Sequence, residues 1–290
     1  MALQRTSNGK TAIILEGGSF RGVFTAGVLD VFMEHGLEFD ACYGVSAGAL
    51  CGMSLKSRQI GRTCRINLAF CDDSRYIGAK AAVSEHSVIG YDFLLGEVQD
   101  RLDPLDNDAY LANPMPLYVA VTDMLFGTAD FLEVRNPELD IAYVQASTSL
   151  PLLTQPVEID GRLFMDGGLA DSVPVEHVLE QAGYDRAVVV LTRERGFQKQ
   201  PYAFMAAARR AYADYPYFLE ALATRHERYN EQREHIWAYE DEGRALVLAP
   251  EKPVEVDQIE RNAPKLLDLY LQGRRVATRQ LDAVRAFAGR

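Results

Sequence analysis

The sequence predicts an α/β fold, and three observations support this prediction. First, a β-rich apolar run at residues 11–15 is followed by a glycine-rich turn and then by a helical pattern over residues 23–35. Second, the same order returns where a short apolar run at residues 39–45 precedes small apolar residues at 47–55. Third, a chain of 290 residues that is 48% hydrophobic is large enough to bury a substantial core.

The first turn, residues 16–22 (EGGSFRG), places several backbone amides at the positive end of a helix. Turns of this kind bind anions. The segment lacks the Lys-Ser/Thr ending of a P-loop and the G-x-G-x-x-G spacing of a dinucleotide site. It fits an oxyanion, the negative oxygen that develops when a nucleophile attacks an acyl carbonyl.

The second turn has Ser46 between Gly44 and Gly48, in the order G-x-S-x-G. Glycines on both sides relieve the crowding of a tight strand-to-helix turn, and the helix N-terminus directs free amides at the serine oxygen. This pattern predicts a nucleophile elbow. The alternative is a close-packed strand-to-helix turn without chemistry, since the pattern also occurs by chance in glycine-rich chains.

A third loop begins at Asp166, which follows a hairpin-like stretch at residues 156–165 with its turn at Asp160-Gly161. Gly167 and Gly168 come next, so nothing crowds the carboxylate. Asp166 is therefore a candidate for orienting and deprotonating Ser46. The alternative is an ordinary Asp-Gly turn.

The chain is predicted to divide after residue 192. Residues 1–192 carry the three loops, and residues 193–290 form a mainly helical C-terminal extension with one strand. The extension is expected to contain a loop (193–201), a helical stretch with a mostly solvated charged face (202–242), a strand (244–249), and one or two helices (258–287) interrupted near Pro264 and Gly273. The strand either extends the sheet or belongs to a small separate subdomain.

Together the three loops resemble those of the patatin-like phospholipases, which have a G-G-G-x-R-G turn, a G-x-S-x-G elbow and a later D-G-G or D-G-A in this order. The stretches 117–123 (LYVAVTD) and 146–151 (ASTSLP) are similar to parts of that family as well. The resemblance covers residues 11–192, and the whole chain most resembles bacterial members with a C-terminal extension. It implies a three-layer α/β/α fold with a mostly parallel sheet.

The resemblance also implies a mechanism and a set of site residues. Ser46 would be the nucleophile and Asp166 the general base of a dyad that cleaves carboxylic esters of phospholipids or related lipids through an acyl-serine. The oxyanion hole would comprise Gly17, Gly18, Ser19, Arg21 and Gly22; the elbow glycines would be Gly44 and Gly48, and the base loop would add Gly167 and Gly168. No metal or cofactor is implied.

Two residues of the first turn, Ser19 and Arg21, need separate consideration. Ser19 stands where the family has its third glycine; its backbone amide remains, so the substitution is expected to tune activity rather than abolish it. Arg21 either holds the turn by bonding to carbonyls or faces an anionic group of the substrate.

The histidines are consistent with a Ser-Asp dyad. The five are His35, His86, His177, His226 and His235, and none has the late strand-to-loop context of a triad histidine. His177, in the helical pattern after the Asp166 loop, is the one alternative base that we retain.

Charge and cysteine content limit the partners. Residues 1–190 contain 13 Lys and Arg against 26 Asp and Glu, and this acidic balance argues against nucleic acid and against tight adsorption to anionic lipid. Any transient membrane contact would need a local patch. The four cysteines have no metal-ligand or disulfide-framework spacing. With no hydrophobic signal region or spanning run, the expected compartment is the cytoplasm.

The candidate patch is an insertion, residues 57–113, whose apolar residues include Tyr76-Ile77, Val88-Ile89 and the run 91–95. They form either a lid or acyl-binding wall, or a helix packed on the core. Two alternative functions remain open: a general esterase or thioesterase for soluble acyl groups, and a non-catalytic binding or regulatory protein that retains the fold.

Overall fold

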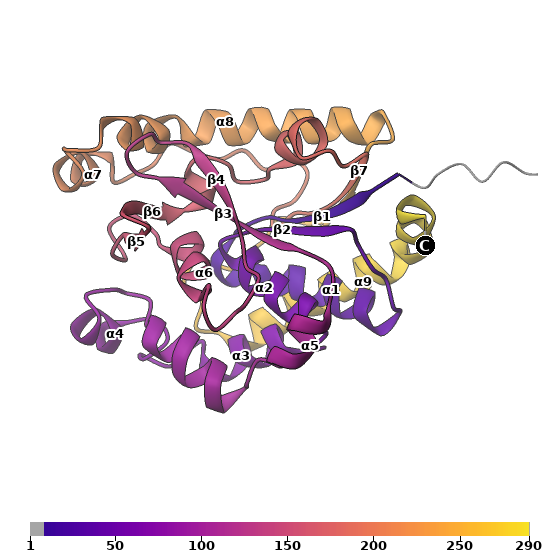
Figure 1. Ribbon diagram of the computed structural model, residues 1–290, viewed down its shortest axis with the longest axis horizontal. Coiled ribbons are helices and arrows are strands. Elements are labelled where there is room, and N and C mark those ends of the chain that lie inside the picture. The colour runs from indigo at the N-terminus through magenta and orange to yellow at the C-terminus, as the bar shows by residue number, and fades with distance from the viewer. Residues whose placement is uncertain (1–8, 290) are drawn as a thin grey trace, which may run out of the picture.

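The computed structural model describes residues 9–289, which form a central eight-stranded sheet covered by helices on both faces (Figure 1). The strands follow the order β5-β6-β3-β2-β1-β7-β8, with β4 paired to β3. Their bounds are β1 Thr11–Leu15, β2 Ala41–Val45, β3 Leu117–Asp123, β4 Ala129–Glu133, β5 Val157–Ile159, β6 Arg162–Asp166, β7 Arg186–Val190 and β8 Ala245–Leu248. The pairs β1–β2, β1–β7, β2–β3 and β7–β8 are parallel, and those of β4, β5 and β6 are antiparallel.

The central strands β1, β2 and β7 are buried on both faces because they are apolar at successive positions. Ile13 and Leu15 of β1 pack into one hydrophobic cluster with residues of the helices α1, α2 and α9. Ala12 and Ile14 pack into a second cluster with α8 on the opposite face. Figure 1 shows α8 along one face of the sheet and α1, α2 and α9 along the other. The predicted three-layer α/β/α fold with a mostly parallel sheet is confirmed.

The helical elements connect these strands. Their bounds are α1 Gly22–Glu34, α2 Ala47–Lys56, α3 Arg62–Phe70, α4 Ala79–Ser84, α5 Asn107–Ala112, α6 Ile141–Thr148, α7 Met205–Ala211, α8 Pro216–Asp241 and α9 Ala263–Ala288. Four shorter or irregular elements are η1 Ser19–Arg21, the π-helix η2 Asp92–Leu102, η3 Gly167–Leu169 and the π-helical η4 His177–Gln181.

The C-terminal strand extends the sheet. β8 pairs in parallel with β7, so it forms one edge of the same sheet that carries β1 and β2. The stretch 202–242 is divided between α7 and α8, and α8 begins at Pro216.

The interruption expected at Gly273 is wrong, because α9 is one continuous helix. Pro264 lies in its first turn, where a missing N–H costs nothing. Gly273 instead allows close contact with α1: a Cβ at this position would lie 2.1 Å from the carbonyl oxygen of Phe24. Helix-to-helix packing therefore outweighs the weak helix propensity of glycine.

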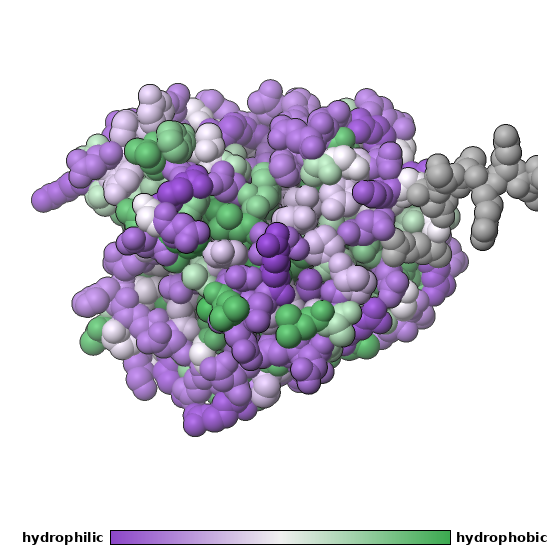
Figure 2. All heavy atoms as spheres, in the orientation of Figure 1, coloured by the Kyte–Doolittle hydropathy of each residue, from purple (hydrophilic) through white to green (hydrophobic). Residues whose placement is uncertain are grey.

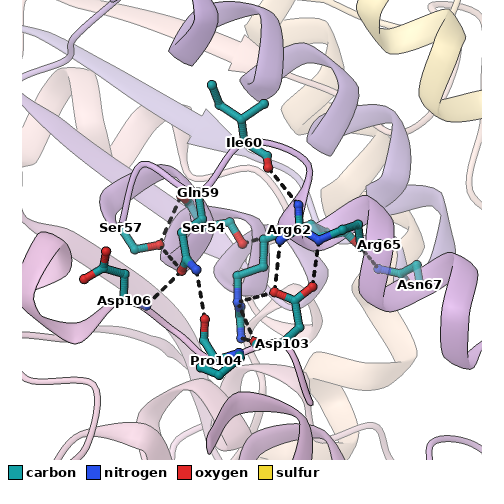
Figure 3. Close-up of polar contacts among 11 residues, drawn as sticks. Ser54, Ser57, Gln59, Ile60, Arg62, Arg65, Asn67, Asp103, Pro104 and Asp106 are labelled. Carbon is teal, nitrogen blue, oxygen red and sulfur yellow. Dashed lines mark hydrogen bonds and ion pairs between the residues drawn. The ribbon is translucent and has the colours of Figure 1, made fainter. Parts of the chain in front are cut away.

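The insertion folds into α3, α4, η2 and α5, and a polar network anchors its far end to α3 (Figure 3). Arg65 donates to both carboxylate oxygens of Asp103, at 2.8 and 3.0 Å, and Arg62 donates to the Asp103 backbone carbonyl. Gln59 donates to the carbonyl of Pro104 at 2.8 Å. A bidentate arginine contact fixes orientation as well as distance. The network therefore holds the later part of the insertion against the start of α3.

Candidate active site

Ser46 is the single residue between β2 and α2, and its backbone is strained. Its φ of 53° and ψ of −121° lie in a region that residues with a side chain rarely adopt. The Ser46 N–H donates to the hydroxyl of Ser147 at 3.0 Å. A Cβ at Gly48 would lie 2.2 Å from the Leu15 carbonyl, and one at Gly44 would lie 2.7 Å from the backbone of Ala49. Both flanking glycines are thus required by close packing.

Strand register brings Asp166 to Ser46. β4 occupies one edge of β3, so β2 and β6 share the other edge and lie end to end along it. Val45 is opposite Ala120, and Asp166 is opposite the next residue, Val121. The residue that follows β2 and the last residue of β6 therefore meet at one point, although 120 positions separate them in the printed sequence.

The Asp166 carboxyl is buried and hydrogen-bonded. It accepts a hydrogen bond at 2.8 Å from the Gly168 N–H, and it interacts with the Ser46 side chain. Burial raises the pKa of Asp166, while the charge of Arg225, the Ser46 side chain and the Gly168 hydrogen bond oppose the increase. A raised pKa makes the carboxylate a stronger base than an exposed aspartate.

The glycine-rich turn between β1 and α1 lies beside Ser46. A Cβ at Gly17 would lie 2.9 Å from the Ser46 Cβ, and Ser19 has a left-handed φ of 51°. The amide of Arg21 donates to Gly18 O, and that of Gly22 donates to carbonyls of the same turn. In the part of the chain that the structure describes, the amides of Gly18 and Ser19 have no acceptor.

Helix α8 contacts the loop after Asp166 and the residue that precedes the glycine-rich turn. Sequence patterns did not predict these contacts. Arg225 donates from Nε to the carbonyl of Gly168 at 2.6 Å, and Arg228 donates to that of Leu169 at 2.7 Å. Tyr229 donates to the buried carboxylate of Glu16 at 2.6 Å. Arg233, also buried, donates to the Tyr229 hydroxyl. The expectation of a mostly solvated charged face therefore fails on this side of α8.

Ser46 opens into a cavity of about 660 Å³. Tyr76, Ile77, Val88, Ile89 and Leu94 of the insertion, together with Leu50, Leu150 and Leu153, supply apolar lining. A smaller adjoining cavity, of about 50 Å³, contains Asp166, Gly17 and Gly18. The insertion thus contributes one wall of the cavity beside the serine, and its apolar residues also pack on the core, so both interpretations describe part of it.

His177 lies away from this cavity. Its ring stacks on Phe131 with centroids 3.9 Å apart, and it contacts Gln181. His226 of α8, which the sequence did not single out, does line the cavity. One of its ring nitrogens is 3.1 Å from the carbonyl of Ala223 in its own helix. Over residues 9–289, no group of three or more His, Cys, Asp or Glu side chains is placed to hold a metal ion.

Comparison with known proteins identifies the family. A family model described as patatin-like phospholipase matches residues 13–179, more than half of the chain. The chain belongs to the patatin-like phospholipase family, as its three loops predicted. Its class is therefore that of a lipid acyl hydrolase. A second model, described as a domain of unknown function (DUF6363), matches residues 215–289, which include α8 and α9.

Several relatives are similar over long stretches. The uncharacterized protein YjjU of Escherichia coli is 26% identical over 281 residues, covering 94% of this chain and 78% of YjjU. An uncharacterized NTE family protein of Mycobacterium bovis is 25% identical over 69% of this chain, which spans about half (53%) of that relative. Lysophospholipase NTE1 of Cryptococcus neoformans is 26% identical over 64% of this chain, but only 11% of its own length is covered.

Among solved structures, VipD from Legionella pneumophila is similar with a TM-score of 0.47 and 13% identity, over 95% of this chain and 67% of that one.

Proposed function

We propose that this protein is a serine acyl hydrolase that cleaves carboxylic ester bonds of phospholipids or related lipids, with Ser46 as nucleophile and Asp166 as general base. The observation that carries the proposal is the strand register that brings these two residues together, with Ser46 lining an apolar cavity of about 660 Å³. Sites for acyl chains are concave and mostly apolar, with few polar groups that fix orientation.

The chemistry needs two steps. In the first, Asp166 takes the hydroxyl proton as the Ser46 oxygen attacks the ester carbonyl carbon; the C–O bond to the alcohol then breaks, and the alcohol leaves with that proton. In the second, water attacks the acyl-serine and gives a proton to Asp166, which returns it to Ser46 as the fatty acid departs. No histidine is required.

The glycine-rich turn would stabilise the oxyanion in both steps. The amides of Gly18 and Ser19 have no acceptor in the described chain and sit beside Ser46, and the neighbouring amide of Gly17 completes the set. Arg21 and Gly22 use their amides to close the turn, so their part is to shape it. Donors that are fixed before the reaction need no reorganisation when charge develops.

The two parts of the chain would have different roles in the reaction. Residues 1–192 supply the dyad and the oxyanion donors, and residues 193–290 supply the α8 contacts that hold the base loop.

Substrate delivery would use a transient contact with a membrane surface. Figure 2 shows a largely hydrophilic face with small apolar patches. Phe204 and Ile259 line the cavity, yet they are 65% and 42% exposed. These two side chains would place the cavity mouth against the lipid surface, but they would not anchor the protein in the membrane. In residues 9–289, no helix is long and apolar enough to cross a bilayer.

The decisive experiment is covalent labelling with a fluorophosphonate probe, with mass-spectrometric mapping of the labelled site. Wild type is expected to be labelled at Ser46, Ser46→Ala not at all, and Asp166→Asn far more slowly. Asp92→Asn, which changes an exposed carboxyl on η2, is the matched control and should match wild type. A folded wild-type protein that resists the probe would contradict the proposal and favour a binding protein.

A substrate comparison separates a lipase from an esterase for soluble acyl groups. Hydrolysis that increases above the aggregation threshold of a lysophospholipid would support the lipid assignment. Equal rates on short-chain esters, without any increase at that threshold, would assign the site to soluble esters or thioesters.

A further inference from the structure

Four basic side chains meet at the Ser46 site: Arg21, Arg193, Lys199 and Arg225. All four line both the apolar cavity and the smaller cavity that contains Asp166. They come from different parts of the fold. Arg21 ends η1, Arg193 and Lys199 lie in the loop that follows β7, and Arg225 lies on α8.

None of the four forms an ion pair with a carboxylate of the described residues, although fourteen other arginines of that part of the chain do. The two buried carboxylates nearby, Glu16 and Asp166, are otherwise engaged. Asp166 accepts from Gly168 and interacts with the Ser46 side chain. Glu16 accepts from Thr192 on one oxygen and from Tyr229 on the other, and Asp257 is exposed at the cavity edge.

Several of their hydrogen-bond donors lack an acceptor. Arg21 is only 8% exposed, and its Nε has no partner in the described chain; the same holds for the Nε of Arg193. The expectation that Arg21 bonds to carbonyls of its own turn is therefore not met. The Lys199 ammonium lies 4.0 Å from the centroid of the Tyr229 ring, a contact that leaves its N–H groups available.

This arrangement is unfavourable in the absence of an anion. Burial, together with the charges of Arg225, Arg21 and Arg193, lowers the pKa of Lys199 to about 7 against the opposing effect of Glu16. Burial and the charge of Arg193 likewise lower the pKa of Arg21 to about 10. Buried charges without partners are costly, so a bound anion would relieve both desolvation and mutual repulsion.

We propose that these four side chains form a phosphate subsite, and that the substrate is an anionic glycerophospholipid whose phosphate binds there while its ester lies at Ser46. The inference rests on the proposed function, because it places the phosphate and the ester in one molecule. Arginine recognises phosphate with paired donors, and several cations together favour a phosphate over a singly charged carboxylate. The adjoining apolar wall then receives the acyl chain.

The test measures binding rather than turnover, in a Ser46→Ala background. The ligands are an ether-linked lysophosphatidate and the matching alkylglycerol, both below their aggregation thresholds. We expect the phosphate ligand to bind at least about tenfold more tightly, since charge-assisted hydrogen bonds contribute this much each. Lys199→Met should remove most of this preference at pH 6, Lys199→Arg should retain it, and the affinity for alkylglycerol should not change.

Lys252→Met is the matched control, because Lys252 is exposed and lies outside both cavities. It should behave as the parent does. Equal affinity of the parent for the two lipids would overturn the inference, as would a preference that Lys199→Met leaves intact.

A third arm distinguishes the source of the phosphate. Competition by inorganic phosphate at concentrations far above that of the lipid is expected. Inorganic phosphate that binds as tightly as the lipid would assign the cations to free phosphate and overturn the lipid assignment. Phosphate-selective binding in a protein that fluorophosphonate does not label would instead contradict the proposed reaction and leave the subsite standing.

Discussion

The hydroxyl of Tyr229 donates a 2.6 Å hydrogen bond to Oε1 of Glu16, across 213 positions of the chain. Glu16 directly follows β1 and precedes the glycine-rich turn, and its other oxygen accepts from the amide and the hydroxyl of Thr192 after β7. Both residues are buried. Helix α8 therefore holds the residue that precedes the glycine-rich turn.

Loss of this bond should weaken both stability and reactivity. Tyr229→Phe leaves one oxygen of a buried carboxylate without its donor, which costs about 1–3 kcal/mol. We expect urea denaturation to show this loss and fluorophosphonate labelling of Ser46 to slow. Tyr217→Phe, which alters a tyrosine that is 60% exposed, is the control. Unchanged stability of Tyr229→Phe would mean that the contact does not hold the turn.

The pH dependence of labelling should follow Asp166. Because burial raises the pKa of Asp166, its carboxylate remains protonated to a higher pH than that of an exposed aspartate, and only the ionised form accepts the serine proton. Labelling should therefore increase as pH rises through the pKa of Asp166. The charges of Arg225 and Lys199 hold that pKa down, so Arg225→Gln should move the acid limb to higher pH.

Arg209→Gln, at an exposed position on α7, should leave this acid limb in place. Two results would contradict the assignment of Asp166 as the base. One is a wild-type labelling rate that increases at the pH expected for an exposed aspartate. The other is an Arg225→Gln variant whose labelling increases at a lower pH than that of wild type.

The contact between Ser46 N–H and Ser147 Oγ should maintain the strained elbow. Ser147→Ala leaves a buried amide unsatisfied, at a cost of about 1–3 kcal/mol. The left-handed backbone of Ser46 adds strain that the surrounding contacts must offset. We expect a lower unfolding midpoint in urea and slower labelling. Ser84→Ala, at an exposed serine that bonds to its own helix, should change neither quantity.

The serine in the glycine-rich turn should matter little to the chemistry. Ser19→Gly keeps the backbone amide and relieves a positive φ. We therefore expect a change in labelling rate far smaller than the roughly 10²–10³-fold loss that follows removal of an oxyanion donor. A change of that larger size would show that the Ser19 hydroxyl itself takes part.

Sequence patterns predicted the parts of the candidate site that depend on local backbone geometry. Ser46 and Asp166 stand in glycine-containing turns next to apolar runs, and such turns are specified by neighbouring residues. The pairing of β6 beyond the end of β2, which brings the two side chains together, depends on the register of strands far apart in sequence. No local pattern encodes it.

The basic cluster was missed for the same reason. Arg193, Lys199 and Arg225 belong to no motif, and only the path of the chain from β7 to α8 brings them to Arg21. One signal was present: Arg225 and Arg233 lie four positions on either side of Tyr229, on the apolar stripe of a helical stretch. Charges on a buried stripe indicate a polar partner rather than a solvated face.

The contact between α1 and α9 provides a test in which packing and helix propensity predict opposite changes in the free energy of unfolding. Alanine normally stabilises a helix over glycine by about 1 kcal/mol, yet a Cβ at Gly273 would lie 2.1 Å from Phe24 O. We expect Gly273→Ala to destabilise the protein by about 1–3 kcal/mol, as overpacking does, in urea denaturation. Gly96→Ala on η2, where a Cβ meets nothing within 4 Å, should be neutral or stabilising. A stabilised Gly273→Ala would mean that the two helices do not pack this closely.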